Sequence, residues 1–93
     1  MPTVQVASDQ VKRVLRKVSV HAGDPDSPQK EAWSQVLNKV HKLLGYAKAG
    51  EWQSMVNNWE DLKIAITRLD PEGEVLHEFN CAEGRLRGDG LFD

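Results

Sequence analysis

The sequence predicts an all-α protein: a small antiparallel bundle of three main helices with a short fourth helix, completed by dimerisation. Three observations support this fold class. Apolar residues recur at helical spacing in three successive segments. The connections between these segments are short and rich in glycine and proline. The 93 residues suffice for one domain with a modest core, and small cores are often completed by a second copy of the chain.

The first predicted helix covers residues 9–22, with Ser8 or Asp9 as its N-cap. Residues 1–7 are expected to form a loose arm before it. Five apolar residues share one face of this helix: Val11, Val14, Leu15, Val18 and Ala22. Four basic residues share the opposite face: Lys12, Arg13, Arg16 and Lys17.

The second and third predicted helices cover residues 28–49 and 51–69. Pro28 suits the first turn of a helix, Gly50 suits the end of one, and Asp70 precedes a proline, which ends the third helix. The two apolar stripes are Trp33, Val36, Leu37, Val40, Leu43, Leu44 and Ala47, and then Trp52, Met55, Val56, Trp59, Leu62, Ile66 and Leu69.

The helical signal weakens after residue 69. Residues 72–82 fit a short fourth helix, which we favour, although Gly73 disfavours a helix and residues 74–79 also fit a strand. Residues 84–93 contain three glycines and no apolar periodicity, so they are predicted to form a flexible tail. The helical domain is therefore expected to span residues 1–83.

The net charge of −2 hides two oppositely charged halves. Residues 1–50 carry a net charge of +4, and residues 51–93 carry −6. This division argues against a uniformly basic nucleic-acid coat and against an acidic disordered chain. We expect the acidic end to dock on the basic helical face or on a partner, so that a dimer or complex weakens as salt is added.

The sequence contains no pattern for membrane insertion or secretion. No segment approaches the ~18 apolar residues that a membrane-spanning helix needs, and the first residues lack the basic and apolar regions of a signal peptide. Cys81 is the single cysteine and cannot form an internal disulfide, which suits a reducing compartment. We therefore expect a cytoplasmic protein with no membrane partner.

Residues with catalytic or metal-binding chemistry are sparse. His77 and Cys81 are four apart and would share a helix face, but a structural zinc site needs four ligands. Acidic residues around Cys81 disfavour its thiolate. No phosphate-binding loop or Ser/His/Asp arrangement is recognisable. We expect no enzymatic activity, no bound metal and no cofactor.

Two sets of residues are candidates for binding a macromolecule. Trp33, Trp52, Met55 and Trp59 are candidate anchors of an apolar face that binds a protein, and core packing is the alternative role for them. Lys12, Arg13, Arg16 and Lys17 are candidate contacts to phosphates or to an acidic partner, and a solvated helix face is the alternative.

The segment from Leu43 to Leu62 resembles part of the pattern found in small flagellar and type III export chaperones. That pattern is a helix, then Ala-x-x-Gly-Glu/Asp-Trp, a hydrophobic pair, and a helix with Glu near its middle. The matching residues here are Ala47, Gly50, Glu51, Trp52, Met55, Val56 and Glu60. The resemblance implies an all-helical, non-enzymatic protein that binds export substrates or regulators. The basic first helix and the lack of a long terminal helix depart from that pattern.

Together these observations predict a small protein that binds another protein stoichiometrically and regulates it, as a chaperone, antagonist or anti-activator. Its partner would be a regulator, a secreted substrate or a transcription factor, and the protein would be a homodimer. The alternative is a nucleic-acid-associated regulator that uses the basic face of the first helix.

Overall fold

The computed structural model describes residues 1–92 and is all-helical over this range. Its four helices are α1 (Val4–Ala22), α2 (Lys30–Ala49), α3 (Trp52–Leu69) and α4 (Glu74–Gly88). The predicted all-α class is confirmed for these residues, and residues 74–79 belong to a helix rather than to a strand. None of the helices within residues 1–92 is both long and apolar enough to cross a membrane.

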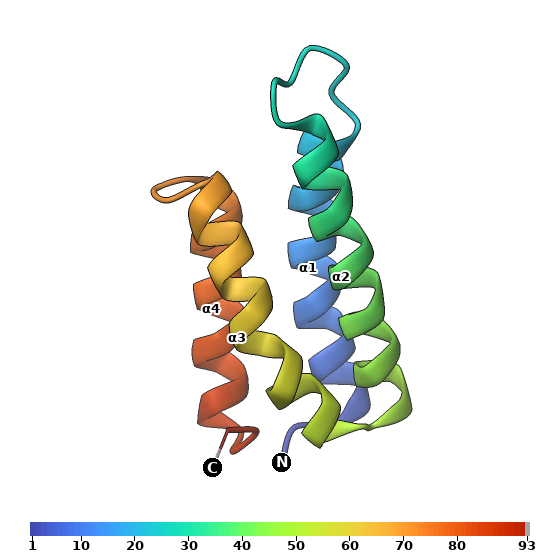
Figure 1. Cartoon of the computed structure of the whole chain (residues 1–93). Helices are drawn as coiled ribbons and strands as arrows, with labels where there is room; N and C mark the ends of the chain where they lie inside the picture. The colour runs from blue at the N-terminus through green and yellow to red at the C-terminus, as the bar shows by residue number, and fades with distance from the viewer. Residues whose placement is uncertain (93) are drawn as a thin grey trace.

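Successive helices run in opposite directions and form a ring (Figure 1). α1 packs against α2 and α4, and α3 packs against α2 and α4. Each helix in the described part of the chain therefore has two antiparallel neighbours. The fourth helix is a full member of the bundle rather than a short addition to three others. The N- and C-terminal ends of the chain lie at the same end of the bundle (Figure 1).

α1 begins at Val4, so the prediction of a loose arm is wrong for residues 4–7. The physical reason is a cap at Thr3, whose side-chain hydroxyl accepts a 3.1 Å hydrogen bond from the backbone N–H of Val6. The first turn is also anchored in the core, because Ala7 is fully buried. α2 begins two residues later than predicted, at Lys30, and no side chain caps its first turn.

Asp70 and Gly73 set the start of α4. The carboxylate of Asp70 accepts a 3.1 Å hydrogen bond from the backbone N–H of Val75. A Cβ atom at residue 73 would collide with that carboxylate. Gly73, which weakens the helical signal in the sequence, therefore permits the side-chain cap that begins the helix.

The prediction of a flexible tail from residue 84 is also wrong for the described residues. α4 continues to Gly88 and is closed by a turn in which Gly90 has φ 91°. The N–H of Leu91 donates to the carbonyl of Leu86, and the N–H of Gly90 donates to that of Arg87, both at 3.0 Å. This Schellman turn folds Leu91 back into the core, where it is 2% exposed. Asp93 lies outside the described residues.

One apolar core runs through the bundle. It draws on all four helices and on the turn after α4, and it consists of Ala7, Val11, Val14, Val18, Ala22, Trp33, Val36, Val40, Leu43, Leu44, Ala47, Met55, Trp59, Leu62, Ile66, Val75, Phe79, Ala82, Leu86 and Leu91. Most of the apolar residues that the sequence placed on one face of each helix are in this set. Burial of these side chains is the main force that holds the four helices together.

Candidate partner-binding groove

Three of the four predicted protein-binding anchors lie in the core. Trp33, Met55 and Trp59 are 3%, 0% and 2% exposed. These three side chains are therefore not available to a partner. The predicted apolar binding face made of all four anchors is not present on the surface of the bundle. α4 covers the apolar stripe of α3 with Met55 and Trp59, which the weak helical signal after residue 69 did not make evident. Trp33 of α2 is covered by α1, where its ring stacks on His21 with centroids 4.5 Å apart.

Trp59 is fully engaged by α4 and by the turn that follows it. Its indole stacks on Phe79 with ring centroids 4.5 Å apart, and it meets Phe92 edge to face. The indole N–H donates a 2.9 Å hydrogen bond to Oε1 of Glu83. Lys63 Nζ lies 3.2 Å from Oε2 of the same carboxylate. This polar cluster satisfies a buried N–H and joins α3 to α4.

Trp52 is the predicted anchor that remains partly exposed. It lines a hollow of about 120 Å³ where the two ends of the chain meet, together with Met1, Gln53, Val56, Leu91 and Phe92. The hollow is small compared with the 300–1,000 Å³ of typical ligand pockets.

The basic residues of α1 remain largely on the surface. Arg13 and Arg16 are exposed, and Lys12 and Lys17 are partly exposed. The ammonium of Lys17 lies 3.3 Å from a carboxylate oxygen of Glu74 at the start of α4. The basic face of α1 therefore meets the acidic second half of the chain at one edge, through an ion pair that is itself exposed.

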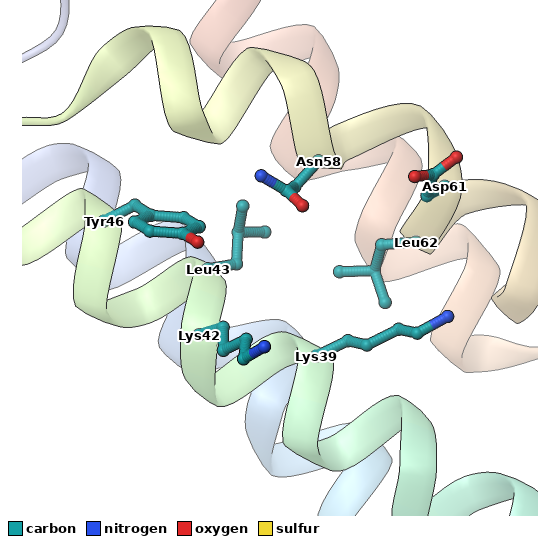
Figure 2. A pocket seen from close by; sticks show the side chains of 7 residues that line it. All are labelled: Lys39, Lys42, Leu43, Tyr46, Asn58, Asp61 and Leu62. Carbon is teal, nitrogen blue, oxygen red and sulfur yellow. The ribbon is translucent and has the colours of Figure 1, made fainter.

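A groove separates α2 from α3 on the surface of the bundle (Figure 2). It contains a hollow of about 170 Å³. The lining residues are Lys39, Lys42, Leu43, Tyr46, Asn58, Asp61 and Leu62. Leu43 and Leu62 are each 2% exposed and form an apolar floor. The polar side chains stand on both sides of that floor (Figure 2).

The groove continues toward the start of α2 as a second hollow of about 200 Å³, lined by Ala32, Gln35, Val36, Lys39, Ala65, Arg68 and Leu69. Lys39 lines both hollows, and both lie between α2 and α3. The α2 residues on this side are spaced by three or four positions and therefore share one helix face. From Ala32 to Tyr46 this face is about 21 Å long, at 1.5 Å per residue.

The side chains along the groove give it a positive charge. Lys39, Lys42 and Arg68 contribute three cations, whereas Asp61 contributes one anion. Within residues 1–92 none of these four side chains is in an ion pair. The groove thus combines an apolar floor with uncompensated positive charge. The sequence contains a signal for the α2 side of the groove, because polar residues such as Gln35, Lys39 and Lys42 recur at helical spacing beside the apolar stripe.

His77 and Cys81 do come together on α4, with Sγ 3.7 Å from Nε2. Both side chains are exposed. Over the described part of the chain, no three side chains of His, Cys, Asp or Glu are grouped so that they could hold a metal ion.

No family model, no curated protein and no solved structure matches this chain. The resemblance to export chaperones therefore depends on residues 43–62 alone.

Proposed function

We propose that this protein binds another protein stoichiometrically through the groove between α2 and α3 and regulates it, as a chaperone, antagonist or anti-activator, without catalysis. The observation that carries this proposal is the groove itself: two buried leucines form its floor, and three cations without ion-pair partners in the described residues line its edges. Apolar grooves between helices commonly accept an amphipathic helix from a partner.

The charge and length of the groove define the partner segment. A helix that buries its apolar face on Leu43 and Leu62 would present its polar face to Lys39 and Lys42. Acidic residues on that polar face would be attracted to the groove and would speed association. The length of about 21 Å corresponds to about 14 residues of a helix. We therefore propose an acidic amphipathic helix of about four turns as the occupant.

The proposed setting is a homodimer in the cytoplasm. The small core and the divided charge of the chain support association of two copies. The partner would be a regulator, a secreted substrate or a transcription factor, as the resemblance at residues 43–62 implies.

A pair of synthetic peptides tests the groove. Both are labelled 14-residue amphipathic helices with the same leucines, but one has Glu and the other Lys on its polar face. We expect the Glu peptide to bind, and to bind more weakly at high salt. Its affinity for the Lys39→Glu/Lys42→Glu variant of the protein should be lower by about tenfold or more. The Lys peptide should bind at least tenfold more weakly than the Glu peptide, because its lysines would lie opposite Lys39 and Lys42.

The matched control is Arg13→Glu/Arg16→Glu, which makes the same charge change at exposed residues of α1 that do not line the groove. This variant should bind the Glu peptide with nearly unchanged affinity at moderate salt. Equal binding of the two peptides, or equal losses in the two double variants, would contradict a specific role for the groove.

Nucleic-acid binding by α1 is the second candidate function. The exposed guanidinium groups of Arg13 and Arg16, neither of which is in an ion pair within residues 1–92, favour it. Phosphate contacts predict binding of duplex DNA that falls steeply with salt and is lost in Arg13→Glu/Arg16→Glu. No binding of a duplex at low salt would exclude this function.

A further inference from the structure

The outer face of α4 carries a strip of four exposed residues: His77, Cys81, Gly84 and Gly88. Their spacing of four, three and four positions places them along one line on the helix. A Cβ atom at Gly84 or Gly88 would have no heavy atom within 4 Å. The strip is therefore low and open at its two glycines, where the backbone of another helix can approach closely.

The fold of one chain does not require these two glycines. Neither has a positive φ, since Gly50 and Gly90 are the glycines with that conformation among residues 1–92. Neither is needed to avoid a neighbouring atom. Glycine within a helix is unfavourable compared with alanine. Gly45 of α2 has the same open surroundings, but it stands alone, whereas Gly84 and Gly88 lie four positions apart on one helix face.

The charged residues beside the strip are complementary between two copies of the chain. Glu78 and Arg85 are seven positions apart, two helical turns, on the edge that also carries Glu74. Glu74 pairs with Lys17 of α1, whereas Glu78 and Arg85 are in no ion pair within residues 1–92. When two copies of α4 lie antiparallel, Glu78 of each copy is opposite Arg85 of the other. One two-fold axis generates both pairs.

We propose that this face of α4 is an interface between two copies of the chain, with the α4 helices antiparallel and the two-fold axis between residues 81 and 82, midway from Glu78 to Arg85. The proposal specifies how the homodimer of the proposed function is built and depends on that dimer, but not on the partner groove. α4 contacts α1 and α3 and not α2 in the described residues, so the groove between α2 and α3 stays open in such a dimer.

A charge swap tests the pairing in sedimentation equilibrium. Glu78→Arg places like charges opposite each other twice, and it should weaken the dimer on the order of tenfold. Arg85→Glu should do the same. The double variant Glu78→Arg/Arg85→Glu restores opposite charges and should recover the dimer. If the single variants do not weaken the dimer, or the double variant does not recover it, the proposed pairing is wrong.

A steric test uses the glycines. Gly84→Leu places a bulky side chain on the strip, so the dimer should be lost while the helical content is retained or increased, because leucine favours a helix. Gly45→Leu is the matched control, since Gly45 is an exposed glycine of α2 that also has open space around it. It should leave the dimer unchanged. A dimer that tolerates Gly84→Leu overturns this interface.

Cross-linking tests the position of the axis. Cys81 is the single cysteine of the chain, and the two thiols would lie within about one residue of the axis. A short bis-maleimide, to which each thiol adds by forming one S–C bond, should link two wild-type chains rapidly at dilute concentration. The control Cys81→Ser/Asn38→Cys moves the thiol to α2 and should link slowly. Equal rates would overturn the proposed axis.

These outcomes separate the two levels of the proposal. A dimer that is insensitive to Gly84→Leu and to the charge swap means that the copies associate through another face. A monomer at all concentrations rejects both the dimer and this interface. Neither result affects the peptide titration, which tests the groove independently.

Discussion

The indole N–H of Trp59 donates a 2.9 Å hydrogen bond to the carboxylate of Glu83, which is only 17% exposed. This bond crosses from α3 to α4, and Lys63 approaches the same carboxylate from α3. Trp59 is a candidate partner-binding anchor in the sequence, but in the structure its contacts are with residues of its own chain. The relationship makes Glu83 a stabilising residue rather than one of many surface acids.

Glu83→Ala is predicted to lower the free energy of unfolding by about 1–3 kcal/mol, because it leaves a buried indole N–H without an acceptor. Glu83→Gln keeps an acceptor and should lower it less. Urea unfolding monitored by circular dichroism measures both. Glu60→Ala, at an exposed position of α3, is the control, and an equal loss in Glu60→Ala would argue against the role of Glu83.

Gly73→Ala and Asp70→Ala are predicted to be coupled. Gly73 has φ −96°, which any residue adopts, so an added methyl group is unfavourable only because it meets the Asp70 carboxylate. Asp70→Ala alone should cost about 1 kcal/mol through the lost cap. Gly73→Ala alone should cost about 1–3 kcal/mol, but much less in the Asp70→Ala background. A double-mutant cycle in urea measures this coupling, and additive losses would contradict it.

Two glycines at the end of α2 are predicted to respond to alanine with opposite signs. Gly45 is exposed in the helix with open space around it, so Gly45→Ala should stabilise the protein by about 0.5–1 kcal/mol. Gly50 has φ 69° in the turn that closes the helix, so Gly50→Ala should destabilise it by about 1 kcal/mol. Thermal unfolding should therefore shift up for one variant and down for the other. Shifts in the same direction would contradict this assignment.

The tryptophans are predicted to differ in their effect on stability. Trp59→Ala should cost about 3–5 kcal/mol because it leaves a cavity in the core. Trp52→Ala should cost clearly less, because Trp52 is only partly buried at the end of the bundle. Guanidinium unfolding of the two variants makes this comparison. Equal losses would mean that Trp52 is as important to the core as Trp59.

The helices could be predicted from the sequence wherever apolar spacing was regular over several turns. Val11, Val14 and Val18 are an example, and all three are at most 1% exposed. The end of α4 could not be predicted in this way, because its glycines have different roles. Gly84 and Gly88 are ordinary helix residues, whereas Gly90 makes the turn that buries Leu91.

The partner surface was less predictable than the fold. Periodic tryptophans show that a helix face is covered, but they do not show whether the covering helix is in the same chain. Trp59 is covered by α4 through Phe79. The groove depends on how α2 and α3 are placed, which brings Lys42 and Asn58 to the same hollow. Such a juxtaposition of residues distant in sequence is not encoded in either helix alone.

The contact between α1 and α4 has a consequence for biosynthesis. The ion pair between Lys17 and Glu74 joins residues 57 positions apart, so α1 has no α4 to pack against while the intervening chain is being made. The apolar face of α1 is then covered only by α2, with which it forms a local helical hairpin. Closure of the ring is therefore a late event in folding, since contacts at large sequence separation form more slowly than local ones.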